Sequence, residues 1–249
     1  MMAPGLRLLR GNIGLALAPI VIGVAGAILA IQVGNAEKDF SEASALQWSE
    51  KLWPQLRRHI ELTLWSTFWV LVIAIPLGIL LTRPRFRFLS GPVLTIANSG
   101  QAIPAYGLLV LLAAWLGTQF STAVLAFTIF AILPVLRNTM VGLEQVDRSV
   151  IEAGRGMGMS KRRALVSIEL PLAVPVILAG VRTALVINVG MAALAFLIGG
   201  GGLGETINSG LKLQRDLTTF TGAAMVALLA LTVDWIAAVA ERVLRPRGL

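Results

Sequence analysis

The residues whose types and spacing could do chemistry lie in one polar segment, which runs from Glu152 to Pro171 with the sequence EAGRGMGMSKRRALVSIELP. Glycines at positions 154, 156 and 158 permit a tight turn and positive φ, and their missing side chains let another protein surface approach the backbone. This pattern predicts non-covalent recognition of a partner rather than the making or breaking of bonds. Apolar contacts for a groove on that partner would come from Val150, Ile151, Met157 and Met159.

Two short helices are predicted on either side of these glycines. Residues 147–153 form the first, with Asp147 near its start, where a negative charge is favourable. Ser160 can cap the second, which runs from Lys161 toward Leu170. The result is a helix–turn–helix, and Pro171 marks the entry to the apolar segment that follows.

The elements that must position this segment are apolar helices. Hydrophobic residues make up 56% of the 249 residues and charged residues 14%, against about 25% in a soluble domain. Several apolar runs are long enough to span a bilayer, whereas a transmembrane barrel would show short alternating segments. The sequence therefore predicts an all-α polytopic membrane protein. Its net charge of +8 is typical of Lys and Arg retained in cytoplasmic loops, so nucleic acid is not expected as a partner.

Six spans are predicted, each long enough for a helix of about 20 residues. They cover residues 12–33, 62–82, 90–116, 121–141, 172–197 and 218–241. Gly100, Pro104 and Gly107 interrupt the third span, where we expect a kink or a re-entrant turn. Irregular backbone of this kind must be buried in protein or line a wet cavity, because lipid cannot satisfy its polar groups.

Basic residues predict the orientation of these spans. The connections on one side of the membrane hold fourteen Lys and Arg residues, including Arg7 and Arg10, and the connections on the other side hold six. Because loops rich in Lys and Arg stay in the cytoplasm, both termini and the loop 142–171 are predicted to be cytoplasmic.

The first 60 residues leave alternatives open. Basic residues before the first apolar run resemble a cleaved signal peptide, but the run is long for one, which favours a retained N-terminal transmembrane helix over residues 1–35. Residues 36–60 hold Trp48 and Trp53 among charged residues. They fit either an amphipathic segment on the extracytoplasmic membrane surface or a plain linker.

Side chains for catalysis are scarce, which disfavours an intramembrane enzyme. The chain has no Cys, and its only His, His59, has no carboxylate or second His at ligand spacing. No metal site is therefore expected, and His59 is predicted to be an interfacial residue.

Gly199, Gly201 and Gly204 satisfy G-x-G-x-x-G, but a dinucleotide site needs a preceding strand, and this run closes a membrane span. The chain has no G-x-x-x-x-G-K-[ST] phosphate loop, so no nucleotide-phosphate site of that kind is expected in it.

Charged side chains inside the predicted spans are few. Arg182 and Asp234 lie at similar depth, roughly 12–15 Å from the cytoplasmic edge at 1.5 Å per residue. A charge there costs several kcal/mol unless it is paired or hydrated. An Arg182–Asp234 ion pair is one alternative, and an Arg182 that snorkels to the inner surface or faces water is the other. Uncharged polar residues near mid-span, some expected to line a translocation route and others to join helices, are Asn98, Gln101, Tyr106, Asn138, Thr183 and Asn188.

The spacing within the polar segment carries a family resemblance. The pattern is E-A-A, three residues, G, nine residues, I-x-L-P, and it is matched by Glu152, Ala153, Gly158, Ile168, Leu170 and Pro171. Gly154 stands in place of the second Ala, which is an exchange of one small residue for another. The segment resembles the cytoplasmic loop through which permease subunits of ABC importers dock on their ATPase.

This resemblance implies a fold and a set of partners. The fold is a type I ABC importer-like permease core of five helices plus one N-terminal helix, with the permease domain over residues 61–245 and the coupling loop at 142–171. The implied partners in the bacterial inner membrane are two ATPase subunits, a second permease copy or paralogue, an extracytoplasmic substrate-binding protein and membrane lipid. ATP and Mg would lie on the ATPase, and no cofactor is expected on this chain.

The chain resembles in particular the permeases for osmoprotectants such as glycine betaine, choline and carnitine. The segments that carry this are Gln101–Ala105, Leu133–Thr139, Arg155–Met159, Gly180–Ala184, Ile187–Gly190 and Ile198–Ile207. Methionine and phosphonate permeases carry a similar glycine run, so an importer of another small solute stays open. A secondary transporter is a further alternative, but no convincing internal repeat is evident.

The glycine run has two interpretations. By the family resemblance it forms a bend near the outer gate, close to a docked binding protein, and a flexible span end is the alternative. The glycines concerned are Gly199, Gly200, Gly201, Gly202 and Gly204.

Overall fold

The computed structural model describes residues 13–244, and all regular secondary structure in this range is helical. The labelled helices are α2 (Ile13–Asn35), α3 (Phe40–Ala45), α4 (Trp53–Leu81), α5 (Ser90–Ala102), α6 (Ala105–Leu116), α7 (Phe120–Glu144), α8 (Arg148–Gly156), α9 (Lys161–Ala164), α10 (Leu170–Ala192), α11 (Gly204–Leu213) and α12 (Asp216–Leu244). π-Helical turns at Trp48–Leu52 and Leu165–Glu169 lead into α4 and α10, and 3-10 turns occupy Arg87–Leu89 and Ala195–Ile198. Both chain termini, with the basic residues at 7, 10, 245 and 247, lie outside the described residues.

The predicted membrane spans are confirmed as helices. Within residues 13–244, the helical stretches long and apolar enough to cross a membrane are Gly14–Asn35, Trp48–Leu81, Phe120–Glu144, Lys161–Ala192 and Asp216–Leu244. The remaining predicted span is broken, as expected from its glycines and proline, because its two halves meet at 97°. Pro104 precedes the second half, and Ile103 before it is extended with ψ of 131°, since a following proline disfavours the helical region.

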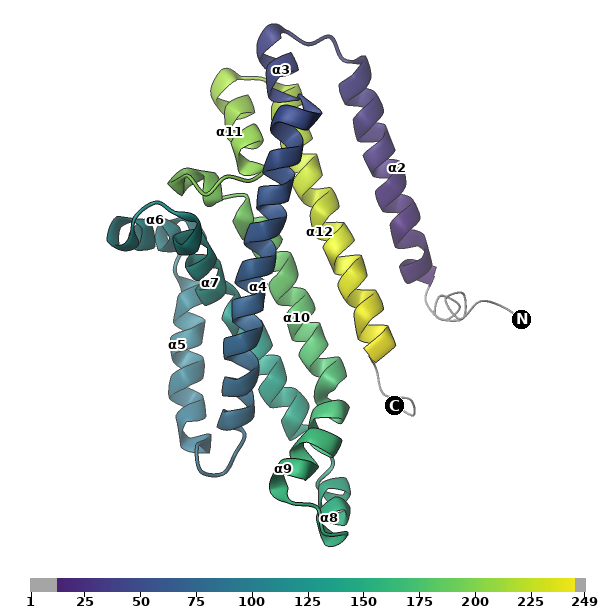
Figure 1. The fold of residues 1–249 in the computed structure, drawn as a ribbon, viewed down its shortest axis with the longest axis vertical. Coiled ribbons are helices and arrows are strands. Elements are labelled where there is room, and N and C mark those ends of the chain that lie inside the picture. The colour runs from purple at the N-terminus through teal and green to yellow at the C-terminus, as the bar shows by residue number, and fades with distance from the viewer. Residues whose placement is uncertain (1–12, 245–249) are drawn as a thin grey trace, which may run out of the picture.

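Helix α7 lies at the centre of the bundle (Figure 1). It packs against α4, α10, α5 and α6, and 56% of its most apolar stretch is buried. Helix α12 lies between α10 and α2, and only 6% of the apolar stretch of either α2 or α12 is buried. The outer faces of these two helices are therefore available to lipid or to another chain.

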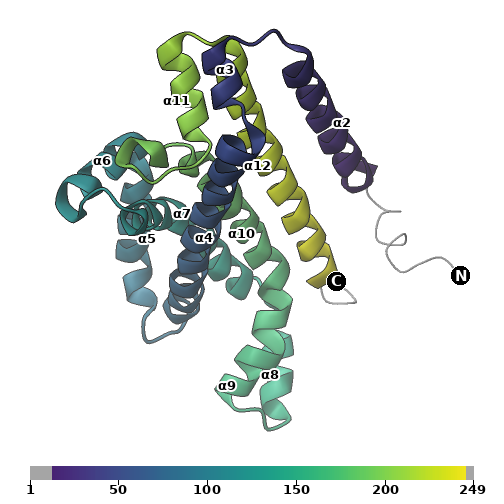
Figure 2. The same cartoon turned by 45° about the horizontal axis from the view of Figure 1, so that its top comes forward.

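The two ends of the bundle carry different structures (Figures 1 and 2). Helices α8 and α9 project beyond the other helices at one end, whereas α3 and α11 lie at the opposite end. Residues 161–192 form one helical stretch of 32 residues, which connects the projecting hairpin to the region just before the glycine run.

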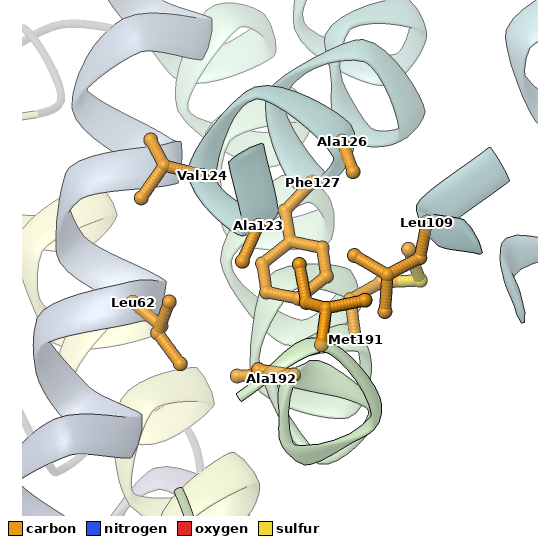
Figure 3. Close-up of a cluster of buried hydrophobic side chains, with 10 residues drawn as sticks. Leu62, Leu109, Ala123, Val124, Ala126, Phe127, Met191 and Ala192 are labelled. Carbon is orange, nitrogen blue, oxygen red and sulfur yellow. The ribbon is translucent and has the colours of Figure 1, made fainter. Parts of the chain in front are cut away.

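The larger core cluster joins three spans to the bent segment (Figure 3). Phe127 of α7 is fully buried and packs in one cluster with Leu62 of α4 and Met191 of α10. Leu109 of α6 belongs to the same cluster, so the second half of the broken span is held against the bundle. The break itself, at residues 102–104, is exposed, so the burial expected for its irregular backbone is not provided within this chain.

Small residues allow α7 and α10 to approach closely. A Cβ atom added at Gly180 would lie 2.8 Å from the Pro134 carbonyl oxygen and 2.7 Å from the Asn138 Cβ. Lipid offers little hydrophobic force for joining helices, so association rests on close van der Waals packing of this kind. Any side chain at position 180 would force the two helices apart.

Helix α4 begins earlier than the sequence indicates. It starts at Trp53, so the last eight residues of the segment predicted at 36–60 belong to this helix, and the rest forms α3 and a π-helical turn. Asp39 caps α3 by accepting from the Glu42 N–H at 2.8 Å, and it pairs with Arg215 in the turn before α12. Hydrogen bonds from the Ser41 hydroxyl and the Glu42 N–H hold the pKa of Asp39 below its usual value.

Candidate functional site

The segment 147–170 forms the predicted helix–turn–helix. Asp147 caps α8 and accepts a hydrogen bond from the Ser149 N–H at 2.8 Å, which lowers the pKa of the Asp147 carboxyl. Ser160 caps α9 and accepts from the Arg163 N–H at 3.3 Å. The second predicted helix continues without a break through a π-helical turn into α10, so the hairpin is an extension of a membrane span.

The three glycines of the hairpin have different roles. Gly158 has φ of +90°, and it alone makes the left-handed turn that the sequence allowed at all three positions. Gly154 and Gly156 lie inside α8 and do not use this conformational freedom. A Cβ at Gly156 would meet nothing within 4 Å, which makes this position a neutral neighbour of the turn.

Gly154 is the buried residue of α8, and it packs against the I-x-L-P part of the motif. A Cβ atom there would lie 2.4 Å from Ile168 Cδ1 and 3.4 Å from the Met159 sulfur. The hairpin therefore closes over position 154 through the end of the Ile168 side chain. This contact explains how a glycine is accommodated where the family pattern has alanine.

We expect Gly154→Ala to leave the hairpin nearly unchanged in stability, and Gly154→Leu to open it. The alanine methyl displaces only the flexible end of Ile168, and the better helix propensity of alanine offsets this by up to about 1 kcal/mol. A leucine side chain has no such space. Hydrogen exchange of the α8 amides measures the difference, and faster exchange in Gly154→Ala than in Gly154→Leu would contradict the packing described.

The outer surface of the hairpin is exposed and carries the predicted apolar contacts in part. Met157 is 77% exposed and Val150 43%, whereas Ile151 and Met159 are half-buried. Glu152 is exposed and forms no ion pair with any residue that the structure describes, and Ala153 beside it is exposed as well. The hairpin thus presents a carboxylate and a methionine to the surroundings.

The base of the hairpin is tied to α4 by an ion pair that the sequence did not predict. Glu169, the variable position of I-x-L-P, is buried, and its carboxylate accepts from Arg83 at 2.7 and 3.3 Å. Arg83 also donates to the Ile79 carbonyl at 3.2 Å and so stays at the end of α4. Leu170 and Pro171, which follow Glu169, begin α10 and are half-buried. An acidic residue beside an apolar span is the signal that could have indicated this pair.

Of the two alternatives for Arg182, the structure shows the ion pair with Asp234. The guanidinium of Arg182 makes two hydrogen bonds to the Asp234 carboxylate, one of them from Nη2 to Oδ2 at 2.6 Å. The pair lines a cavity of about 460 Å³ between α2, α10 and α12, and Trp235 beside it donates to the Leu15 carbonyl of α2 at 2.9 Å. These charges therefore lie on the α2 side of the bundle, away from the α4–α7 core.

The other predicted polar residues lie at separate places. Gln101 donates to the Phe130 carbonyl of α7 at 3.0 Å and so holds the end of α5. Asn188 is fully buried, and its amide lies 3.0 Å from the Thr67 hydroxyl of α4. Asn138 packs beside Gly180 at the α7–α10 contact. Tyr106 on α6 is 56% exposed, and Asn98 on α5 and Thr183 on α10 are exposed as well.

The backbone of the glycine run adopts conformations that other residues rarely take. Gly199, Gly201 and Gly202 have φ of +71°, +82° and +96°, values that favour glycine. A Cβ at Gly204 would lie 1.9 Å from the Ala193 carbonyl oxygen, so α11 starts directly against the end of α10. No strand precedes the run within residues 13–244, which agrees with the rejection of a dinucleotide site.

Polar side chains from the first turns of α4 contact this run. Arg58 donates to the Gly200 carbonyl at 3.1 Å, and its guanidinium lies 4.1 Å from the centre of the Phe120 ring. The Gln55 side chain bonds the Thr206 hydroxyl and also donates to Glu205 at 3.3 Å. The flexible span end considered above is therefore attached to α4 at several points.

His59 is fully buried, so its prediction as an interfacial residue was wrong. Its Nε2 lies 2.8 Å from the Val189 carbonyl oxygen of α10, and its Nδ1 lies 3.3 Å from the Leu203 amide nitrogen. The ring replaces water with two backbone partners, which is why it can be buried. Helical spacing was the signal that could have predicted this burial, because His59 shares a buried face of α4 with Leu62, Thr63, Ser66 and Thr67. No group of three metal-ligating side chains occurs in the described part of the chain.

Comparison with known proteins adds a family and relatives to this geometry. Residues 74–246 match the family described as binding-protein-dependent transport system inner membrane component. The chain is 39% identical over 191 residues to the choline transport system permease protein OpuBB of Bacillus subtilis, which covers 77% of this chain and 87% of that protein. It is 42% identical over 190 residues to the osmoprotectant import permease protein OsmY of Salmonella typhimurium, with 76% and 80% covered. The carnitine transport permease protein OpuCD of Listeria monocytogenes is 36% identical over 209 residues, with 84% and 91% covered.

Solved structures share the fold. A chain of the MetNI methionine ABC transporter in an inward-facing conformation matches with a TM-score of 0.66 and 23% identity, over 78% of this chain and 95% of that one. A chain of an amino acid ABC transporter with histidines matches with a TM-score of 0.67 and 18% identity, over 83% and 99%.

Proposed function

Because the chain belongs to the binding-protein-dependent transport system inner membrane components, we propose that it forms the passage of an ATP-driven importer for quaternary amines such as choline, carnitine and glycine betaine. The observation that carries this substrate class is the identity of 36% to 42% to permeases named for carnitine, choline and osmoprotectants. As a permease component, the chain is a multi-pass protein of the bacterial inner membrane that works with an ATPase and a substrate-binding protein.

The α8–α9 hairpin is the surface on which the ATPase docks in this proposal. Its support is the position of the hairpin, which projects beyond the bundle and exposes Glu152, Ala153 and Met157. The Arg83–Glu169 pair and the Gly154–Ile168 contact then connect a docked ATPase to α4 and α10. ATP with Mg would be held by two ATPase subunits, because this chain has no phosphate loop, and a second permease copy or paralogue would complete the passage.

The proposed orientation puts the hairpin in the cytoplasm together with both termini. Its support is the distribution of charge, because the hairpin and the connections at the same end of the bundle, together with the last turn of α12, hold Arg83, Arg85, Arg87, Arg148, Arg155, Lys161, Arg162, Arg163 and Arg242. The opposite end, with α3, the tilted Trp48–Trp53 pair and the glycine run, would then face outward, where the substrate-binding protein docks.

Gly158→Trp is expected to abolish substrate-stimulated ATP hydrolysis while leaving membrane insertion intact. An indole at this exposed turn obstructs the docking surface, and the left-handed φ of +90° adds strain for any residue with a Cβ. We expect stimulated activity to fall by about tenfold or more, and a loss of about 1.4 kcal/mol of docking free energy is enough to weaken the docking equilibrium tenfold. The measurement is ATPase activity of the reconstituted complex with its ATPase and binding protein.

Gly156→Ala is the matched control, because a Cβ at this neighbouring exposed glycine has open space and ordinary φ. It should keep the wild-type rate. Unchanged stimulation in Gly158→Trp would argue against docking at the hairpin.

The substrate class is tested in the same preparation by titrating candidate solutes. Stimulation by choline, carnitine or glycine betaine supports the proposal, and stimulation only by methionine or another solute would replace the substrate class while keeping the importer. If no ATPase associates with the chain, the docking proposal is refuted.

A further inference from the structure

The glycine run has almost no side chains with which to hold its own position. Four consecutive glycines, at 199–202, separate the 3-10 turn at Ala195–Ile198 from Leu203 and α11. Three of the four have positive φ, so their backbone could adopt many other conformations at little cost. What fixes this loop must therefore come from neighbouring elements.

The ring of His59 reaches the loop backbone directly. The Leu203 N–H donates to Nδ1 at 3.3 Å, so Nδ1 carries no hydrogen. The hydrogen of a neutral imidazole is then on Nε2, where it donates to the Val189 carbonyl at 2.8 Å. One buried ring thereby joins three elements, which are α4, α10 and the end of the glycine run.

The glycines make room for this attachment. A Cβ at Gly202 would lie 3.4 Å from His59 Nδ1 and 3.3 Å from the Ala192 carbonyl oxygen. A Cβ at Gly201 would lie 2.9 Å from Cγ of Arg58, the residue before His59. The missing side chains thus let α4 approach the loop backbone, and Arg58 adds a second bond at the Gly200 carbonyl.

We propose that His59 is the positioning residue that sets the glycine run relative to α4 and α10, so that a shift between these two helices moves the run. The inference rests on the proposed function, in which α10 and α4 are connected to the ATPase at their other ends. Val189 lies one turn before the end of α10, so the imidazole contacts that helix close to the loop.

Two conservative substitutions separate the two bonds of the ring. His59→Asn keeps an acceptor near the place of Nδ1 and so preserves the bond from the Leu203 N–H, while it loses the bond to Val189. His59→Gln keeps a donor near the place of Nε2 and so preserves the bond to Val189, while it loses the bond from the Leu203 N–H. A residue that merely fills the core predicts the opposite order, because the shorter Asn side chain leaves the larger cavity.

The position of the loop can be followed with a spin label. The chain contains no Cys, so Leu197→Cys, at an exposed residue two positions before the run, gives a single labelling site. We expect the nitroxide to be as immobile in His59→Asn as in the parent, and clearly more mobile in His59→Gln. Substrate-stimulated ATPase activity should follow the same order, with His59→Gln losing most of the stimulation.

Each outcome decides the matter. Greater mobility in His59→Asn than in His59→Gln, or equal mobility in both, would overturn the proposal. If the His59 variants do not fold, Gly202→Ala disturbs the same attachment from the loop side, and a label as immobile in it as in the parent would refute the inference. Spin-label mobility needs neither substrate nor ATPase. A parent complex without stimulated ATPase would therefore refute the proposed function and leave the mobility result to test His59 separately.

Discussion

Replacing Arg83 with Ala is expected to destabilise the protein more than any other single change at the base of the hairpin. The carboxylate of Glu169 is buried and would lose its only ion-pair partner among the described residues. Removing one partner of a buried pair costs about 3–5 kcal/mol, and the lower end applies here because the Arg83 side chain is 32% exposed. The loss should appear as a lower midpoint of thermal unfolding in detergent and as weaker coupling to the ATPase.

The paired replacement Arg83→Met with Glu169→Leu should recover most of this stability. It removes both charges together and fills similar volume, so no uncompensated charge stays buried. Arg85→Ala is the matched control, because Arg85 is exposed and makes no ion pair with the described residues. If the double variant is no more stable than Arg83→Ala, then Glu169 is not stabilised by this pair.

Reversing one charge of the Arg182–Asp234 pair is the second change with a large expected effect. Asp234→Arg would place two guanidinium groups side by side inside the predicted bilayer, where each unpaired charge costs about 2.5–3.5 kcal/mol at the centre of a span. The cost is reduced where water reaches the cavity beside α2. We expect Asp234→Arg and Arg182→Asp each to lower the yield of folded protein and the transport rate severely.

The combined reversal, Arg182→Asp with Asp234→Arg, restores opposite charges at the same two positions and should recover much of both losses. Asp216→Ala is the control, since Asp216 is an exposed carboxylate at the start of the same helix. Size-exclusion profiles of the detergent-solubilised variants measure folding, and uptake into vesicles measures transport. A double variant no better than either single one would mean that the pair does not hold α10 and α12 together.

The helices and the hairpin could be predicted from the sequence because their signals are local. Apolar length defines each span, Pro104 marks the break at which the third span bends, and Asp147 and Ser160 cap the helices they precede. The Arg182–Asp234 pair could also be anticipated from the sequence, because the depth of a residue in the membrane can be counted along each helix from its end.

The contacts that the sequence did not indicate join distant parts of the chain. Arg83 and Glu169 are 86 residues apart, and His59 is 130 residues from Val189. Nothing in the local composition around either residue names its partner, because a basic residue after a span is expected for orientation alone. Nothing in the sequence indicated that Gly154 lies against Ile168, which only the packing of α8 shows. Tertiary packing decides such cases, and local patterns do not contain it.

The unbroken helix from Lys161 to Ala192 has a mechanical consequence, because its close contact with α7 at Gly180 can serve as a fulcrum. At 1.5 Å per residue the arm on the hairpin side is about 28 Å long and the arm on the glycine-run side about 18 Å. If the helix tilts about this point, the end near the glycine run moves about 0.6 times as far as the hairpin end and in the opposite direction. A hairpin displaced by about 3 Å would therefore move the far end by about 2 Å. The outer end of the helix would thus move less but with greater force than the hairpin end. Moving the close contact with α7 by one helical turn would change the ratio of the two displacements without altering either end of the helix.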